Sequence, residues 1–219
     1  MYIACGQRKG AEAERQEMNT VLKRLSILFI ISLLFVASVF AGPFGIEMGM
    51  TLEQLKQMGV NPVLLSDGSG RYYITPIKLH PDFDLYIVNI SPTYGVYRLL
   101  AVSKDIPTSS FGTELKNKFY EIQKGLNSVY GNSTTYDFLK VGSIWDQDRD
   151  WMMALKNEER ILSAFWDRES NSNLPDDLSG VMLSARANSI SEGYLRLQYE
   201  SINVDKADAE LDAQTSSVF

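Results

Sequence analysis

The sequence predicts an α+β protein in which an antiparallel β-sheet of about six strands is covered by amphipathic helices. Short runs rich in Tyr, Ile and Val are joined by connectors too brief for the crossovers that parallel strands need. Between these runs, longer segments carry apolar residues at steps of three and four, the spacing of one helical face. Because 45% of the residues are apolar, the chain also has enough material for a packed core.

A short helix is expected first, because Thr51 and Gln54 form a capping-box pattern. Leu52, Leu55 and Met58 would share its apolar face. Three β-like runs follow, over 71–77, 83–90 and 96–103. Their connectors contain Pro, Asp and Gly, as turns between antiparallel strands do.

The clearest helix is expected to begin at Ser109 or Ser110 and to end before Gly131. Five apolar residues recur on one of its faces: Leu115, Phe119, Ile122, Leu126 and Val129. The opposite side is charged, as expected for a helix that lies on a sheet.

The second half of the chain repeats this order more faintly. A helix is expected over 143–157, strands over 160–166, 181–187 and 194–200, and a last helix from Asp205. Each half then reads helix, three strands, helix, which raises the hypothesis of a degenerate internal duplication. The alternative, that meanders with covering helices recur by chance, stays open.

Residues 1–41 are expected to be a leader with a secretion signal. Lys23 and Arg24 precede an uncharged apolar stretch that ends with the small residues Val39 and Ala41, so cleavage after Ala41 is expected. An uncleaved anchor is the alternative, although the stretch is slightly short for a span of about 20 residues. Met18 is a candidate for the true start.

Cleavage would leave residues 42–219 as one globular domain with 16 basic and 24 acidic side chains, a net charge of −8. This balance argues against nucleic acid as a partner. The only cysteine, Cys5, precedes the signal, so the exported part would have no disulfide and no lipidated cysteine. A periplasmic or secreted location is expected, with contact to the membrane only through the signal segment before cleavage.

Asp146, Asp148 and Asp150 are weak candidate metal ligands, because they alternate like the start of a calcium loop. The pattern then fails, since Trp151 stands where that loop needs a glycine. The structural alternative is a helix start that Ser143 caps, with carboxylates near the positive end of the helix dipole. Neither a metal nor a cofactor is expected.

No catalytic residue is assigned. His80 is the only histidine, which excludes mechanisms that need a His pair or a His–Cys pair. It lies next to Asp82 and Asp84, and a solvated turn residue is expected there rather than a catalytic dyad. The scattered carboxylates of the chain could hydrolyse glycans only where two of them meet in a cleft.

The aromatic residues are the remaining candidates. Trp145, Trp151 and Trp166 are expected mainly in the core. Tyrosines accompany the first sheet, and those on one exposed face would form an amphipathic surface typical of protein interfaces. The candidate binding residues are Tyr72, Tyr86, Tyr94 and Tyr97. Cross-strand aromatic pairing within the sheet is the alternative.

The first helix start, Gly49-Met50-Thr51 with Gln54 and Leu55, resembles the opening of the small lipoprotein of the β-barrel assembly machinery and its relatives. It is also similar to the openings of small uncharacterised envelope proteins of bacteria. The resemblance implies a helix-plus-antiparallel-sheet fold, like that of the β-lactamase inhibitor proteins, with a non-catalytic interaction role. The lipidated cysteine of that lipoprotein has no counterpart here.

The sequence therefore predicts an exported, non-catalytic protein that binds another envelope or secreted protein. The alternative is a carboxylate-dependent hydrolase of envelope glycans. An aromatic sheet face would favour the first function, and a pocket with converging carboxylates the second.

Overall fold

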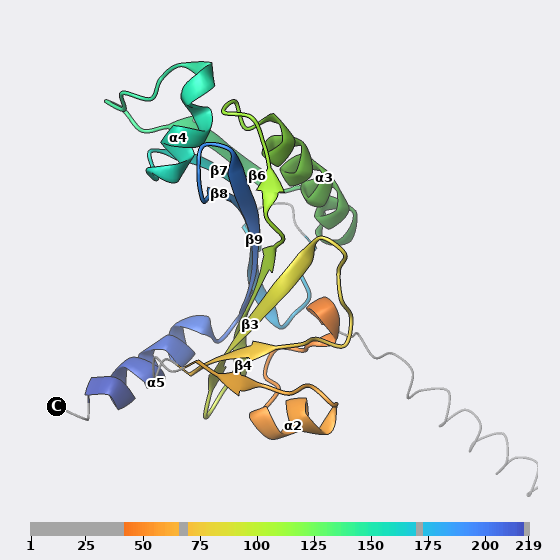
Figure 1. The fold of residues 1–219 in the computed structure, drawn as a ribbon. Coiled ribbons are helices and arrows are strands. Elements are labelled where there is room, and N and C mark those ends of the chain that lie inside the picture. Colours follow the sequence, from red (N-terminus) through yellow and green to blue (C-terminus); the bar gives the residue numbers. More distant parts are fainter. Residues whose placement is uncertain (1–41, 66–69, 170–172, 217–219) are drawn as a thin grey trace, which may run out of the picture. The chain divides into compact units, whose positions relative to one another are not determined.

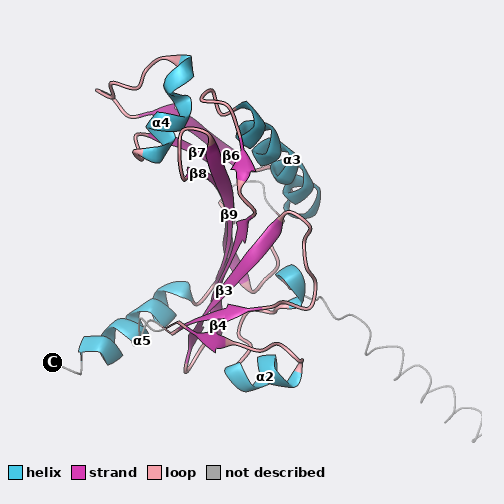
Figure 2. Ribbon diagram, viewed as in Figure 1, coloured by secondary structure: helices cyan, strands magenta, loops and turns pink. Residues whose placement is uncertain are grey.

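The computed structural model describes residues 42–65, 70–169 and 173–216, whose strands form one antiparallel sheet (Figures 1 and 2). The expected leader, its cleavage site, Met18 and Cys5 lie outside the described residues. Ala41–Phe219 is one compact unit. Within the described ranges, no helix has the length and apolar character needed to cross a membrane.

The α+β class and the antiparallel sheet are confirmed, but about six strands was too low a number. The strands are β1 (Val63–Leu64), β2 (Arg71–Ile74), β3 (Phe83–Ser91), β4 (Gly95–Ser103), β5 (Ile106–Pro107), β6 (Thr134–Leu139), β7 (Arg160–Asp167), β8 (Leu178–Ala187) and β9 (Glu192–Ser201). The helical elements are η1 (Pro43–Gly45), α2 (Leu52–Gln57), α3 (Thr113–Tyr130), η2 (Asp148–Asp150), α4 (Trp151–Lys156) and α5 (Val204–Ser216). Eight of the nine strands run in the order β1-β2-β3-β4-β9-β8-β7-β6, and β5 pairs with β9 beside this path.

Of the four expected helix starts, those at Thr51 and at about Asp205 are confirmed and the other two are corrected. The Thr51 N–H donates to Gln54 Oε1 at 2.8 Å and the Gln54 N–H to Thr51 Oγ1 at 3.2 Å, so the capping box is formed. α3 begins at Thr113 instead of Ser109 or Ser110, because Gly112 at φ 69° turns the chain into the helix.

The helix expected over 143–157 is much shorter. Ser143 does not cap a helix, because its hydroxyl bonds the Glu159 carboxylate and accepts the Trp145 N–H at 3.1 Å. These bonds hold the segment as a loop, and α4 begins only at Trp151.

One face of the sheet, the core face, is buried. Paired residues point to the same side of a sheet, and one row of pairs crosses five strands on this face: Tyr86, Ala101, Leu197, Leu183 and Ala164. All five side chains are buried. α3 covers the row with the buried residues Leu115, Phe119 and Ile122, as its apolar spacing predicted, although Val129 at the end of that pattern is exposed.

The remaining core contacts come from α4 and the N-terminal segment. Trp151 of α4 and Trp166 of β7 are both in the core, which confirms the expectation for these two residues. The Trp166 Nε1–H donates to Asn127 Oδ1 at 3.1 Å and to the Gly131 carbonyl at 2.9 Å, which ties β7 to the end of α3. Phe44 of η1 packs its ring edge-on to Tyr86, with 5.0 Å between centroids.

Two described helices, α3 and α5, are longer than two turns. Only α5 lies on the face opposite the core face. α5 contacts β3 and β4, and Figure 1 shows it on the other side of the sheet from α2 and α3. Ala207 of α5 and Tyr97 of β4 are both buried but lie outside the main core cluster. The rest of this face is the surface on which the candidate site lies.

The sheet consists of two four-stranded meanders, β1–β4 and β6–β9, that join where β4 pairs with β9. A helix precedes each meander, α2 before β1 and α3 before β6, and α4 lies in the β6–β7 connection. If the two halves of the chain are duplicated units, the boundary between them therefore lies before α3 and not after it. The duplication itself stays a prediction.

Candidate functional site

The tyrosine surface expected from the sequence is not formed. Tyr86 and Tyr97 are each only 2% exposed, so the prediction that they are accessible is wrong. Tyr86 lies on the core face and donates its hydroxyl to the Phe83 carbonyl at 3.3 Å. Tyr72 is half-buried against the core, and Tyr94 is half-buried in the β3–β4 turn.

A β-bulge explains the position of Tyr97. Asn89 pairs with Arg98 but Ile90 pairs with Val96, so Tyr97 is the extra residue on β4. Its hydroxyl accepts a hydrogen bond from Asn89 Nδ2 at 3.3 Å on the side away from the core. Burial raises the pKa of the Tyr86 and Tyr97 hydroxyls. The four tyrosines thus share no exposed face, and their role in binding stays a prediction.

The weak metal candidates do not come together. Asp146 is exposed in the loop before η2, and Asp148 and Asp150 are the first and last residues of η2. Across the described ranges, no group of three or more His, Cys, Asp or Glu side chains is arranged to hold a metal ion.

His80 lies in the turn before β3, as expected. Its Nδ1 accepts the Asp82 N–H at 3.2 Å, and its ring packs edge-on to Phe83 with 5.3 Å between centroids. Asp82 also accepts a hydrogen bond from Lys118 Nζ at 3.3 Å. These contacts hold the turn against α3.

The face opposite the core face carries two rows of side chains, partly exposed except for the buried Ser163 and Ser184, which we call the open face. Its members are Tyr73, Ile87, Leu100, Gln198, Met182 and Phe165 in one row, and Leu85, Val102, Arg196, Ser184, Ser163 and Tyr136 in the next. Tyr73 is 42% exposed and Tyr136 is 48% exposed, at opposite edges of the sheet. The described helices therefore leave an aromatic and aliphatic surface accessible across the sheet.

Two arginines lie side by side near the centre of this face. Arg196 of β9 pairs with Ser184 of β8, and Arg186 pairs with Tyr194, so the two arginines are diagonal neighbours. Side chains in such positions on adjacent strands are within reach of each other. Burial, together with repulsion from Arg186, lowers the pKa of the Arg196 guanidinium.

Neither arginine has a close carboxylate partner within the described chain. The nearest to Arg186 is Glu158, whose Oε1 is 4.0 Å from Nη1 and whose side chain is 79% exposed. Arg196 Nη2 makes only a long contact of 3.5 Å to Gln198 Oε1. The Nε atoms of both arginines and the Oγ of Ser184 are buried without a hydrogen-bond partner in the described residues.

The other end of β9 on the same face is fully paired. Arg98 Nε donates to Glu200 Oε1 at 3.0 Å, and Arg98 Nη2 donates to Asp208 Oδ2 of α5 at 3.0 Å. Gln198 Nε2 donates to the same Glu200 oxygen at 2.8 Å. These bonds fasten α5 to the sheet.

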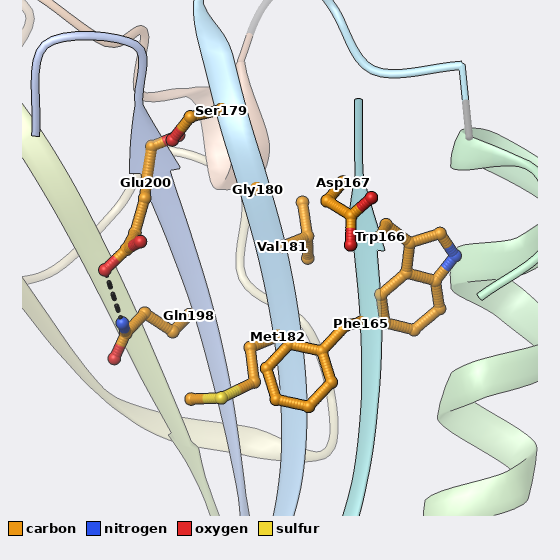
Figure 3. A pocket seen from close by; sticks show the side chains of 9 residues that line it. All are labelled: Phe165, Trp166, Asp167, Ser179, Gly180, Val181, Met182, Gln198 and Glu200. Carbon is orange, nitrogen blue, oxygen red and sulfur yellow. Dashed lines mark hydrogen bonds between the residues drawn. The ribbon is translucent and has the colours of Figure 1, made fainter. Parts of the chain in front are cut away.

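A pocket of about 250 Å³ opens above Gly180, where a side chain is missing from the open face. Asp167 and Glu200 lie on either side of this glycine in the same row. Figure 3 shows that the Glu200 side chain runs toward Gln198 and away from Asp167. Asp167 Oδ1 accepts the Glu169 N–H at 3.0 Å. The two carboxylates do not converge on one point of the pocket.

Sequence reasoning missed the open face but not for lack of a signal. In 181–187 the residues Met182, Ser184 and Arg186 alternate with Val181, Leu183 and Ala185, which is the pattern of a strand with one partly exposed face.

The helix start at Thr51 that carried the resemblance to the assembly lipoprotein is formed, but many Thr-x-x-Gln sequences form a capping box. That resemblance therefore stays a prediction. The chain matches no protein-family model, no curated protein and no solved structure.

Proposed function

We propose that residues 42–219 form an exported, non-catalytic protein that binds another envelope or secreted protein through the open face. The observation that carries the proposal is the composition of that face. Aromatic residues, Met and Arg are enriched where proteins bind each other, and Phe165, Met182 and Arg196 lie close together here.

The pocket above Gly180 supports the same function. Its wall combines the apolar side chains of Phe165 and Met182 with the amide of Gln198. Pockets of this kind accept the anchoring side chains that carry most of the binding energy at protein interfaces.

A carboxylate-dependent hydrolase remains the second candidate, because Asp167 and Glu200 line one pocket. They are separated by one strand, so their Cα atoms are about 10 Å apart by the usual strand spacing, and inverting glycosidases place two carboxyl groups about 6.5–9.5 Å apart. However, Arg98 and Gln198 already bind Glu200. A catalytic acid would have to leave both, which favours binding over hydrolysis.

The test is a pull-down from periplasmic extract with three forms of the protein, followed by mass spectrometry. Met182→Glu places a charge at the centre of the open face, and Val129→Glu places the same charge on the exposed side of α3. We expect one partner to be recovered with the wild type and with Val129→Glu but not with Met182→Glu. Circular dichroism would establish that all three forms are folded.

Equal recovery by all three forms would overturn the assignment to the open face. Cleavage of envelope glycans by the wild type, lost in Asp167→Asn, would favour the hydrolase. Export is tested separately by sequencing the mature N-terminus, which we expect to be Gly42.

A further inference from the structure

We infer that Arg186, Arg196 and Ser184 form a binding site for one carboxylate, supplied by an Asp or Glu side chain of the partner protein. This inference rests on the proposed function, because it names the chemistry that the open face recognises. It adds a specific contact that the described chain does not make for itself.

The first argument is the placement of two like charges. Arg186 and Arg196 project from adjacent strands on the same face, and each lowers the free energy of an anion placed between them. Without an anion they repel each other, and partial burial weakens the screening of that repulsion by water.

The second argument is the number of unsatisfied donors. Ser184 is 2% exposed, and its Oγ has no hydrogen-bond partner among the described residues. The same holds for the buried Nε atoms of Arg186 and Arg196. Buried polar groups of this kind are rare in folded proteins and require an explanation, which a ligand that completes the bonding would supply here.

A carboxylate matches this set of donors. Its two oxygens offer about four acceptor sites, so one group can accept from both guanidinium ions and from the serine hydroxyl. Arginine binds carboxylates with two parallel hydrogen bonds, and such charge-assisted bonds are stronger than neutral ones. The carboxylate would therefore satisfy both guanidinium groups at once, and it would reach the Ser184 hydroxyl and the two Nε atoms only when the side chains above them move, because these three atoms are buried.

The third argument is that the chain supplies carboxylates elsewhere on the same face. Arg98 has two carboxylate partners, Glu200 and Asp208, at 3.0 Å each. The chain has 27 acidic and 21 basic side chains, so acidic residues are not scarce. The described chain nevertheless places none against Arg196.

The surroundings identify the source of the carboxylate as a protein. Val102 and Leu85 continue the row of Arg196 and Ser184 on one side, and on the other side Ser163 is followed by Tyr136. Apolar groups on both sides of a charge suit a side chain presented by a folded surface. They suit a free inorganic anion poorly, because its hydration shell would have to be removed against apolar walls.

The test follows the arginine Nε–Hε signals of the purified protein by nuclear magnetic resonance during peptide titration. The probe is acetyl-Phe-Glu-Phe-amide, and acetyl-Phe-Gln-Phe-amide is its neutral control. We expect the Arg186 and Arg196 signals to shift and saturate with the Glu peptide. The Gln peptide should leave them unchanged, and sodium sulfate at equal ionic strength should not reproduce the shifts.

Two variants and a control sharpen the test. Ser184→Ala should weaken binding of the Glu peptide about tenfold, since it removes one hydrogen bond to a charged group. Arg196→Gln should weaken it by at least about tenfold for the same reason. Arg149→Gln removes an equal charge from an exposed position in η2 and should change nothing.

If the Arg186 and Arg196 signals did not shift during titration with the Glu peptide, the proposed carboxylate site would be overturned. An equal response to the Gln peptide or to sulfate would overturn it as well. None of these results would affect the proposed function, because recovery of a partner by the wild type and not by Met182→Glu is measured independently.

Discussion

One face of β9 carries two contrasting groups of charged side chains. In the first, which we call the finished network, each charged group has a partner of opposite charge; in the second, the unfinished network, two arginines lack a close carboxylate partner in the described chain. Arg98 pairs with Glu200 and with Asp208 of α5, and the hydrogen bonds extend to Gln198. Two residues further along, Arg196 has no carboxylate partner in the described chain and lies beside a second arginine. The first network fastens α5 to the sheet, and the second carries the charges that the proposed partner would neutralise.

The coverage of the two ends differs in the same way. α5 lies over the finished network and is held further by Glu210, which accepts hydrogen bonds from the hydroxyls of Ser91 and Thr93. At the other end, the aromatic and aliphatic side chains of the open face stay partly exposed. α5 thus covers the finished network, whereas no described helix covers the part of the open face around Arg196.

The largest expected effect comes from breaking the finished network. Arg98→Gln leaves Glu200 and Asp208 without their cation and loosens α5. We expect the free energy of unfolding to fall by about 2 kcal/mol, which is less than for a fully buried pair because these side chains are a quarter to two-fifths exposed. Urea denaturation followed by circular dichroism measures the change.

The matched change at the unfinished end, Arg196→Gln, serves as its comparison. If Arg196→Gln destabilised the protein as much as Arg98→Gln does, the two ends would not differ and the comparison would fail.

Ser184→Ala should increase the free energy of unfolding, which is the opposite of the effect expected for Arg98→Gln. The hydroxyl is buried without a hydrogen-bond partner in the described residues, and burying such a group costs about 1–3 kcal/mol. Removing it should therefore raise the free energy of unfolding by about 1 kcal/mol, measured by the same urea transition.

Ser201→Ala is the control, because the Ser201 hydroxyl accepts the Asn203 N–H at 2.9 Å and is also buried. That change should destabilise the protein. A loss of stability in both variants would show that Ser184 has a hydrogen-bond partner after all.

Arg196→Gln itself should change stability only slightly, and upward. It removes the repulsion from Arg186 and a partly desolvated charge, and it loses one long contact to Gln198. We expect a gain of about 0.5 kcal/mol or less at low salt, which shrinks as salt screens the repulsion. Melting temperatures at low and high sodium chloride would measure it, and a gain that grows with salt would contradict the electrostatic cause.

Much of the fold could be predicted because local patterns were strong. Two of these patterns each lie within a single helix and can be read without knowing its neighbours. They are the capping box at Thr51 and the apolar spacing of Leu115, Phe119 and Ile122. β6 was missed although Tyr136 and Phe138 alternate with polar residues, because this edge strand is exposed along nearly its whole length.

The site could not be predicted because it depends on register. The alternation within β8 and β9 places Arg186 and Arg196 on the same face, but which residues of the two strands lie beside each other depends on their pairing, and a shift of two residues would change the neighbours of Arg196. Tyr97 illustrates the same point, since one bulge places it under α5. Residues whose positions depend on strand pairing are thus the ones that sequence reasoning misplaced.

The smallest effect concerns how α5 is held at low pH. Hydrogen bonds from the Ser91 and Thr93 side chains lower the pKa of the Glu210 carboxyl below its ordinary value of 4.5. A lowered pKa means that the charged form is favoured in the folded state, so this stabilisation is present above pH 4.5 and is lost as the pH falls through the folded-state pKa. The difference in melting temperature between the wild type and Glu210→Gln should therefore stay constant from about pH 7 to pH 5 and then shrink toward pH 3. A difference that persists unchanged to pH 3 would mean that the carboxylate charge does not hold α5, and that other contacts of the helix, such as those of Arg98 and Ala207, hold it.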